Sequence, residues 1–306
     1  MIEKSYEYSF SFNRKSFSTW LHILADWTWI VFSIYLSVNF QGWLVYLFSF
    51  VIIGSRQHAI AVHLHDATHY LLFRSRSLND GVARLLMEWP LFASLDNYRR
   101  LHRGHHYYLN TCKDPDWVRN SPYKMLEATS FPRRVWLLSG AGVFLQAVSA
   151  LFFGVSIDRK EGVARTMHQQ KPWVFWLRCL FYTVTLALLY VNNWLPLFFF
   201  YWVMPYLFYF FPVMRFRGLS EHWALPSTRM ENKSRTVKVG WLGRFLIYPK
   251  NINYHVEHHT HPNVPFYYLP ELHRCLINNK EYRHHAHITN GVWGVVKELL
   301  GFRYSF

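Results

Sequence analysis

Histidines gather in three short stretches of this chain, at spacings that suit a metal site. Two triplets have the spacing i, i+3, i+4, and one pair has the spacing i, i+4, so each set would share one face of a helix. The eight residues are His65, His69, His102, His105, His106, His255, His258 and His259. Neutral imidazole is the commonest metal ligand in proteins, and eight copies exceed what one tetrahedral zinc ion can use. The spacing therefore predicts a site for two metal ions.

A ninth ligand is suggested by its place in the chain. His222 follows the C-terminal end of the apolar stretch 195–213, just as His65 follows the apolar stretch that begins at residue 43. A lone histidine is more often structural, but this position favours a role in the same site.

Acidic residues stand next to several of these histidines. A carboxylate that accepts the second ring N–H of a ligand histidine fixes its tautomer and orientation. We expect this role for Asp66, Glu221 and Glu257. Asp114 and Asp116 flank a proline in a turn signal, so we interpret them first as turn formers and second as partners of a ligand histidine.

Other histidines fall off the predicted ligand faces. His58 and His63, near the first pair, are expected to be structural or to support a ligand. His261 and His273, near the last triplet, are expected to lie at the surface or behind the ligands. Three histidines near the end are expected to take no part in chemistry, namely His284, His285 and His287.

The elements that position these residues are predicted to be membrane helices. The mean hydropathy of −0.03 averages very apolar blocks with strongly basic segments. Only 17% of the 306 residues are charged while 20% are aromatic, a pairing typical of membrane proteins with interfacial Trp and Tyr. Four apolar blocks at 19–38, 43–65, 173–191 and 195–213 have short uncharged links within each pair. We predict an all-α membrane protein with four transmembrane helices in two hairpins and a cytosolic helical cap that carries the histidines.

The net charge of +15 is placed between the apolar blocks rather than along one stripe. This favours a positive cytoplasmic face over a nucleic-acid surface, so no nucleic-acid partner is expected. Residues 1–18 are polar and predict no signal peptide, and the short linkers favour a bacterial inner membrane. The active site is expected on the cytoplasmic side.

A fifth apolar block at 135–155 is long enough to span the membrane. If it crossed, the last histidine triplet would lie on the opposite side from the first two sets. We therefore expect this block to be re-entrant or interfacial. The predicted organisation is a cytosolic segment 1–18, a membrane domain 19–275 and a cytosolic tail 276–306.

Ligand type alone leaves iron, zinc, copper and nickel open. A site at the ends of membrane helices has lipid methylenes within reach, and chemistry on unactivated C–H bonds needs an oxidising metal, which favours two iron ions with dioxygen as co-substrate. Two rivals are weaker. A membrane zinc hydrolase would explain the His65/His69 spacing but lacks the Glu base of that motif, and a metal transporter would place its ligands at mid-membrane.

Four motifs together resemble the histidine boxes of the integral-membrane fatty acid desaturase family. They are His65-Asp-Ala-Thr-His69, His102-Arg-Gly-His105-His106, Glu221-His222, and Asn253-Tyr-His255-Val-Glu-His258-His259. The resemblance covers about residues 50–275. It implies a non-haem di-iron site held by all nine histidines, with Asn253 among the supporting residues, and a desaturase that removes two hydrogens from a lipid acyl chain. The family also contains hydroxylases and ketolases that act on sphingolipids or carotenoids, so both alternatives stay open.

No cytochrome b5-like His-Pro-Gly-Gly is present, because Asn263 follows His261-Pro262. The three cysteines are far apart and form no Cys-x-x-Cys pair that could hold an iron–sulfur cluster. The electron donor is therefore expected to be a separate ferredoxin-like or cytochrome protein.

Overall fold

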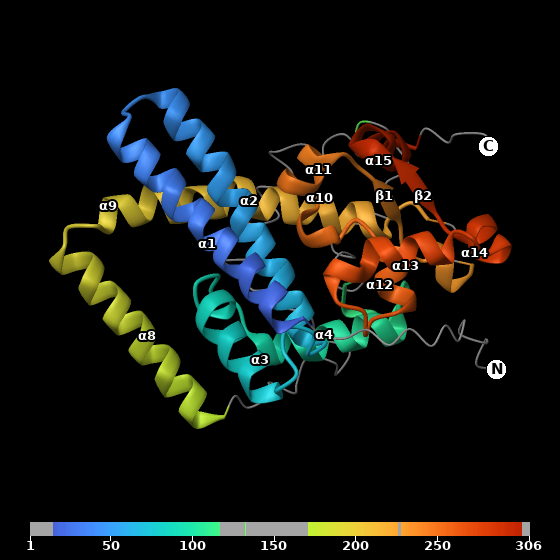
Figure 1. The fold of residues 1–306 in the computed structure, drawn as a ribbon, viewed down its shortest axis with the longest axis horizontal. Helices are drawn as coiled ribbons and strands as arrows, with labels where there is room; N and C mark the ends of the chain where they lie inside the picture. The colour runs from blue at the N-terminus through green and yellow to red at the C-terminus, as the bar shows by residue number, and fades with distance from the viewer. Residues whose placement is uncertain (1–14, 117–131, 133–170, 226–227, 302–306) are drawn as a thin grey trace.

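The computed structural model describes residues 15–116, 132, 171–225 and 228–301, and this part of the chain is mainly helical. Four helical stretches are long and apolar enough to cross a membrane (Figure 1). They are α1 (Ser16–Asn39), α2 (Trp43–Thr68), α8 (Pro172–Val191) and the stretch Leu195–His222. These stretches agree with the four apolar blocks, although α2 continues one turn beyond the predicted end at His65. The predicted re-entrant block at 135–155 lies outside the described residues.

Helices α1 and α2 pack side by side, and both bury small polar residues. Thr19, Ser33 and Ser49 are fully buried, and Ser49 Oγ donates a hydrogen bond to the carbonyl of Ser33 at 2.8 Å. Small residues let two helix backbones approach closely, and in lipid such hydrogen bonds stabilise the contact. Of the four stretches, α2 is the most buried, so it forms the centre on which the other elements pack.

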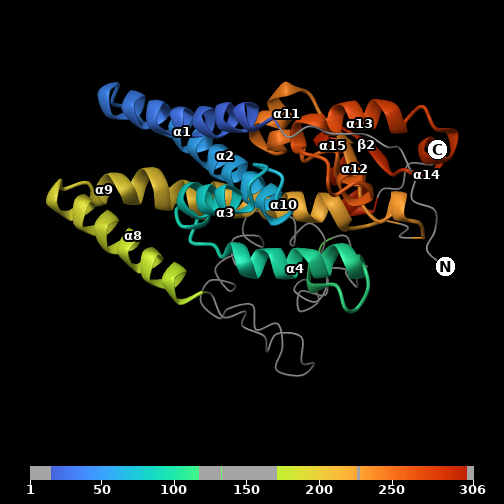
Figure 2. The ribbon, with the colours of Figure 1, turned by 60° about the horizontal axis from the view of Figure 1, so that its bottom comes forward.

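The stretch Leu195–His222 is one long helical rod, and α8 diverges from its start (Figure 2). It consists of α9 (Leu195–Phe198), the π-helical turns η3 (Phe199–Val203) and η4 (Tyr206–Phe210), and α10 (Phe211–His222). Pro205 and Pro212 stand next to these π turns. The different hydrogen-bond spacing of a π turn accommodates the backbone N–H that each proline lacks. Only 6% of the apolar window of α8 is buried, as expected for a helix that faces lipid.

Three helices follow α2 before the undescribed segment. They are α3 (Arg76–Ala83), the π turn η1 (Arg84–Glu88) and α4 (Leu95–Tyr108). Ser94 caps α4 by accepting from the backbone N–H of Asn97, so the chain enters this helix at a defined residue. Arg99, on the first turns of α4, donates to the carbonyl of Ala67 at the end of α2 at 3.0 Å, which ties the two helices together.

The C-terminal part is a set of short helices with one small parallel sheet. In order these elements are η5 (Met230–Asn232), β1 (Thr236–Lys238), α11 (Trp241–Leu246), η6 (Pro249–Asn251), α12 (His255–Thr260), η7 (Phe266–Tyr268), α13 (Leu269–Leu276), α14 (Lys280–His285), β2 (Ile288–Asn290) and α15 (Gly291–Leu300). Strands β1 and β2 pair with Thr236 opposite Ile288.

Residues 277–301, part of the expected cytosolic tail, are packed into the fold. Val295 and Leu299 of α15 are fully buried beside Tyr248 and Val237. Glu298 of the same helix pairs with the buried guanidinium of Arg235 at 2.9 Å. Burial of this apolar face and pairing of β2 with β1 explain why α15 joins the rest of the protein.

Candidate metal centre

Four helices carry the nine histidines that the sequence singled out. His65 lies on the last turn of α2 and His69 directly after it, His222 is the last residue of α10, and the two triplets lie on α4 and α12. The i, i+3, i+4 spacing works as expected, because each triplet lies on one helix and turns its rings to a common side. All nine side chains meet in this region.

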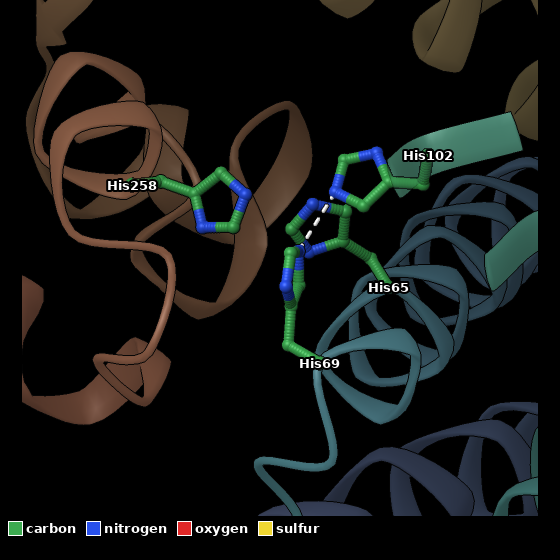
Figure 3. A group of neighbouring side chains, drawn as sticks. All are labelled: His65, His69, His102 and His258. Carbon is green, nitrogen blue, oxygen red and sulfur yellow. Dashed lines mark hydrogen bonds between the residues drawn. The ribbon is translucent and has the colours of Figure 1, made fainter. Parts of the chain in front are cut away.

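The first group contains His65, His69, His102 and His258, whose candidate ligand atoms lie within 4.8 Å of one another (Figure 3). Nε2 of His69 and Nε2 of His102 are 2.9 Å apart. Figure 3 shows the ring of His258 reaching toward the other three from the opposite ribbon.

The second group contains His105, His222, His255 and His259, also within 4.8 Å. Nε2 of His222 lies 2.9 Å from Nε2 of His255 and 3.2 Å from Nε2 of His105. Nε2 of His259 lies 3.1 Å from Nε2 of His255.

The ninth imidazole, His106, joins the first group. Its Nε2 lies 3.0 Å from Nε2 of His102 and 3.0 Å from Nε2 of His258. Its ring also stacks on the ring of His259 at 4.4 Å between centroids, so it lies at the boundary between the groups.

The hydrogen-bond partners of the ring nitrogens that face away from the imidazole groups define which nitrogen carries the proton. Nδ1 of His105 lies 2.9 Å from a carboxylate oxygen of Asp114, and Nδ1 of His222 lies 3.4 Å from the carbonyl oxygen of Lys233. A carbonyl or carboxylate oxygen only accepts, so in each neutral ring the proton is assigned to Nδ1 and a lone pair remains on Nε2. The two Nε2 atoms, 3.2 Å apart, then face each other as acceptors. A cation between them turns this repulsion into attraction, so the donor set fits a metal ion.

The first group shows the same pattern. Nδ1 of His65 lies 3.3 Å from Oδ1 of Asp66, which agrees with the expected role of that carboxylate, and Oδ2 of Asp66 accepts from the backbone N–H of Phe266. Nε2 of His65 is buried without a hydrogen-bond partner among the described residues. An unpartnered buried acceptor that faces other imidazoles again fits a cation.

Burial keeps these rings neutral. It lowers the pKa of His69 to about 4, and the charges of Arg103 and Arg99 lower this pKa further. It lowers the pKa of His106 to about 3, against the opposing charge of Asp116. Burial also lowers the pKa well below the ordinary value for four more rings outside the membrane spans, those of His102, His255, His258 and His259. At neutral pH the lone pairs are therefore available to a metal ion.

Two of the expected supporting residues contact neighbouring elements rather than a ligand ring. Glu257 is fully buried and accepts hydrogen bonds from Tyr282 at 2.8 Å and Thr236 at 2.5 Å, and it also pairs with Nδ1 of His273. Asn253 donates to the carbonyl of Val237. These bonds hold α12 against β1, α13 and α14.

For two other residues the structure supports a role behind the ligands that the sequence analysis had given as one of two alternatives. Asp114, interpreted first as a turn former, makes the close contact with His105 and also accepts from the backbone N–H of Asn110 and Asp116. His273, expected at the surface or behind the ligands, is buried against Glu257. His105 and Asp114 stand nine residues apart, a spacing that no helical period relates, so the sequence offered this contact only as a second interpretation of Asp114.

Comparison with known proteins agrees with the histidine pattern. The family model described as fatty acid desaturase matches residues 41–291. The chain is 26% identical to dihydrorhizobitoxine desaturase of Bradyrhizobium elkanii, over 79% of this chain and 70% of the relative. It is 22% identical to sn-1 oleoyl-lipid 12-desaturase of Synechocystis sp., over 88% of this chain and 78% of the relative. With the model match over most of its length and its four candidate membrane spans, the chain is an integral-membrane protein of the fatty acid desaturase family.

Proposed function

We propose that this protein is a di-iron, dioxygen-dependent desaturase that introduces a C=C bond into the acyl chain of a membrane lipid. The observation that carries the proposal is the pair of imidazole groups in which Nε2 lone pairs face each other, as at 3.2 Å between His105 and His222. Nine neutral nitrogen donors and nearby carboxylates suit two transition-metal ions.

Two iron ions held by the nine histidines would supply the dioxygen activation that unactivated methylene groups require. The reaction consumes dioxygen, two electrons and two protons, and it yields an alkene and two water molecules. The chain's own contribution is to hold the nine rings neutral and oriented. Asp66 and Asp114 fix the tautomers of His65 and His105 through Nδ1, so that Nε2 faces the metal ion.

The proposed topology has two hairpins that enter from the cytoplasmic side of a bacterial inner membrane. Support comes from Figure 1, where the short links at 40–42 and 192–194 lie at the same end of the molecule. The histidines follow the opposite ends of α2 and α10, next to Lys- and Arg-rich segments. Under the positive-inside rule those segments are cytoplasmic, and the active site is then on that side.

The proposed substrate is an acyl lipid because the site follows the ends of apolar helices that expose many large side chains. The name of one relative specifies an oleoyl lipid, and the name of the other specifies dihydrorhizobitoxine. We favour the acyl lipid, and we expect the electrons to come from a separate ferredoxin-like or cytochrome protein. The net charge of +15 would attract an acidic donor, so turnover with the donor should slow as ionic strength rises.

The test is mass spectrometry of lipids and small metabolites from a host that expresses the wild type, His259→Ala or His284→Ala. His284 is exposed on α14 and serves as the matched histidine control. We expect an acyl chain lighter by two hydrogens with the wild type and the control, and none with His259→Ala. A product heavier by one oxygen would replace desaturase by hydroxylase. Full activity of His259→Ala, or a purified wild type that contains zinc and no iron, would refute the proposal.

A further inference from the structure

The nine imidazoles divide unequally between the two groups. The first group has four histidines and gains His106 as a fifth, while the second group has four. An iron ion commonly accepts up to six ligands, so the second group offers one imidazole fewer to an ion of the same kind.

The carboxylate of Glu221 lies at the second group. Its Oε2 is 3.6 Å from Nε2 of His255, and this same nitrogen faces the Nε2 atoms of His222 and His259. Nitrogen and oxygen ligands lie about 2.1 Å from a transition-metal ion, so two ligand atoms of one ion are about 3.0 Å apart at a right angle and about 3.4 Å apart at a tetrahedral angle. A separation of 3.6 Å is slightly wider than the second value and fits two donors to one ion.

Glu221 differs in this respect from the carboxylates that fix tautomers. Asp66 and Asp114 approach Nδ1 of His65 and His105, the ring nitrogens that face away from the imidazole groups. Glu221 instead approaches the ring nitrogen of His255 that faces into its group. A carboxylate in that position competes with no outward hydrogen bond and is placed to bind the same ion as the ring.

The environment of Glu221 leaves its charge incompletely satisfied. The residue is 2% exposed, and its Oε1 makes no hydrogen bond with any described residue. Arg217 Nη1 lies 3.3 Å from that oxygen without hydrogen-bond geometry. An ionised carboxylate that is buried with one nearby cation and no hydrogen bond at Oε1 is still costly, and a metal ion at the adjacent imidazoles would offset the cost.

The backbone around Glu221 is held firmly in place. The backbone N–H of Arg235 donates to the carbonyl of Glu221 at 2.8 Å, and the guanidinium of Arg235 donates to the carbonyls of Ser220 and Trp223. Glu298 in turn pairs with that guanidinium. The last turn of α10, which carries Glu221 and His222, is thus anchored to β1 and α15.

We infer that Glu221 is a fifth protein ligand, a carboxylate, of the metal ion in the second group, which holds His105, His222, His255 and His259. This inference rests on the proposed function. It makes the two metal positions chemically different, with five imidazoles at one and four imidazoles and a carboxylate at the other. The anionic donor favours the more highly charged ion at the second position.

The test compares iron-loaded full-length wild type with Glu221→Gln and with Glu271→Gln as the matched control. Glu271 is an exposed carboxylate on α13, away from the two histidine groups, so its replacement makes the same chemical change without altering the site. The measurements are iron per protein, the Mössbauer spectrum with iron-57, and the rate at which a chelator removes iron.

We expect two irons and two distinct quadrupole doublets in the wild type and in Glu271→Gln. In Glu221→Gln one doublet should shift or disappear, and one iron should be lost about 10- to 100-fold faster. If that variant does not fold, Glu221→Asp, which withdraws the carboxylate by one methylene, should show the same selective change.

Two irons with wild-type spectra and release rates in Glu221→Gln would overturn the inference while the proposed function stood. A wild type that holds two zinc ions would refute the proposed function instead. In that case a selective loss of one zinc from Glu221→Gln would still support the carboxylate ligand, and equal retention of both would reject it.

Discussion

Asp26 is the centre of a buried ion cluster that joins α1, α2 and η6. The carboxylate is 1% exposed and lies 3.1 Å from Arg56 Nη1, 2.8 Å from Lys250 Nζ and 3.1 Å from His63 Nε2. It belongs to a candidate membrane span, where a charge persists only when it is paired. Lys250 stands in η6, five residues before α12 begins, so the cluster connects the membrane helices to the third set of histidines.

Replacing Asp26 by Asn removes the carboxylate shared by the two buried cations. Loss of one partner from a buried ion pair costs about 3–5 kcal/mol because the other charge is left uncompensated. Arg56 keeps the carbonyl of Phe245 as an acceptor and Lys250 keeps the carbonyl of His22 at 3.4 Å, so we expect the lower end, about 3 kcal/mol. At about 2–4 °C per kcal/mol, Tm should fall by about 6–12 °C.

The assay is thermal unfolding of the purified protein in one detergent for Asp26→Asn, Lys250→Met and the double variant. If the ion pair is the cause, the double variant loses less than the sum of the single losses, with a coupling of at least about 1 kcal/mol. A single Asp26→Asn variant within about 0.5 kcal/mol of the wild type, or strictly additive losses, would refute the reasoning.

Three further predictions concern affinity, packing and pH. Asp114→Asn should weaken iron binding about 10- to 100-fold, measured as iron release to a chelator, since it loosens the contact that orients His105; unchanged release would count against that role. Gly54→Ala should lower stability by about 1–3 kcal/mol in thermal unfolding, because a Cβ there would lie 2.6 Å from Tyr209 Cβ, whereas Gly218→Ala meets no atom within 4 Å and should cost little. The metal-free protein should lose stability as pH falls from about 6.5 toward 4, because the unfolded chain takes up protons near pH 6.5 while His69 in the fold resists them until about pH 4; a Tm independent of pH over this window would contradict the shift.

Much of the site could be predicted from the sequence because ligand spacing is a local property. The i, i+3, i+4 triplets follow from helical geometry alone, and the four apolar blocks follow from hydropathy. The division of the ligands between two groups does not. His102 and His106 of α4 join the first group while His105, between them, joins the second, and that choice depends on where α12 and α10 lie.

The same limit applies to the supporting contacts. Asp26 lies within the apolar block 19–38, but its partners Arg56 and Lys250 are 30 and 224 residues away. Lys250 reaches it from a residue with φ of 55°, a left-handed conformation that no pattern in the sequence indicated for a lysine. The packing of residues 277–301 also depends on a distant contact, the pairing of β2 with β1.

The distribution of ligands explains why so much short, irregular structure surrounds α12. Helix α2 contributes histidines to the first group and α10 to the second, whereas α4 and α12 each contribute to both. The two membrane segments therefore need only emerge near each other, and α4 and α12 must fix the separation of the groups. A six-residue helix has little stability of its own. The buried bonds of Glu257 to Thr236 and Tyr282, and the cluster around Asp26 just before α12, supply the rigidity that its length cannot.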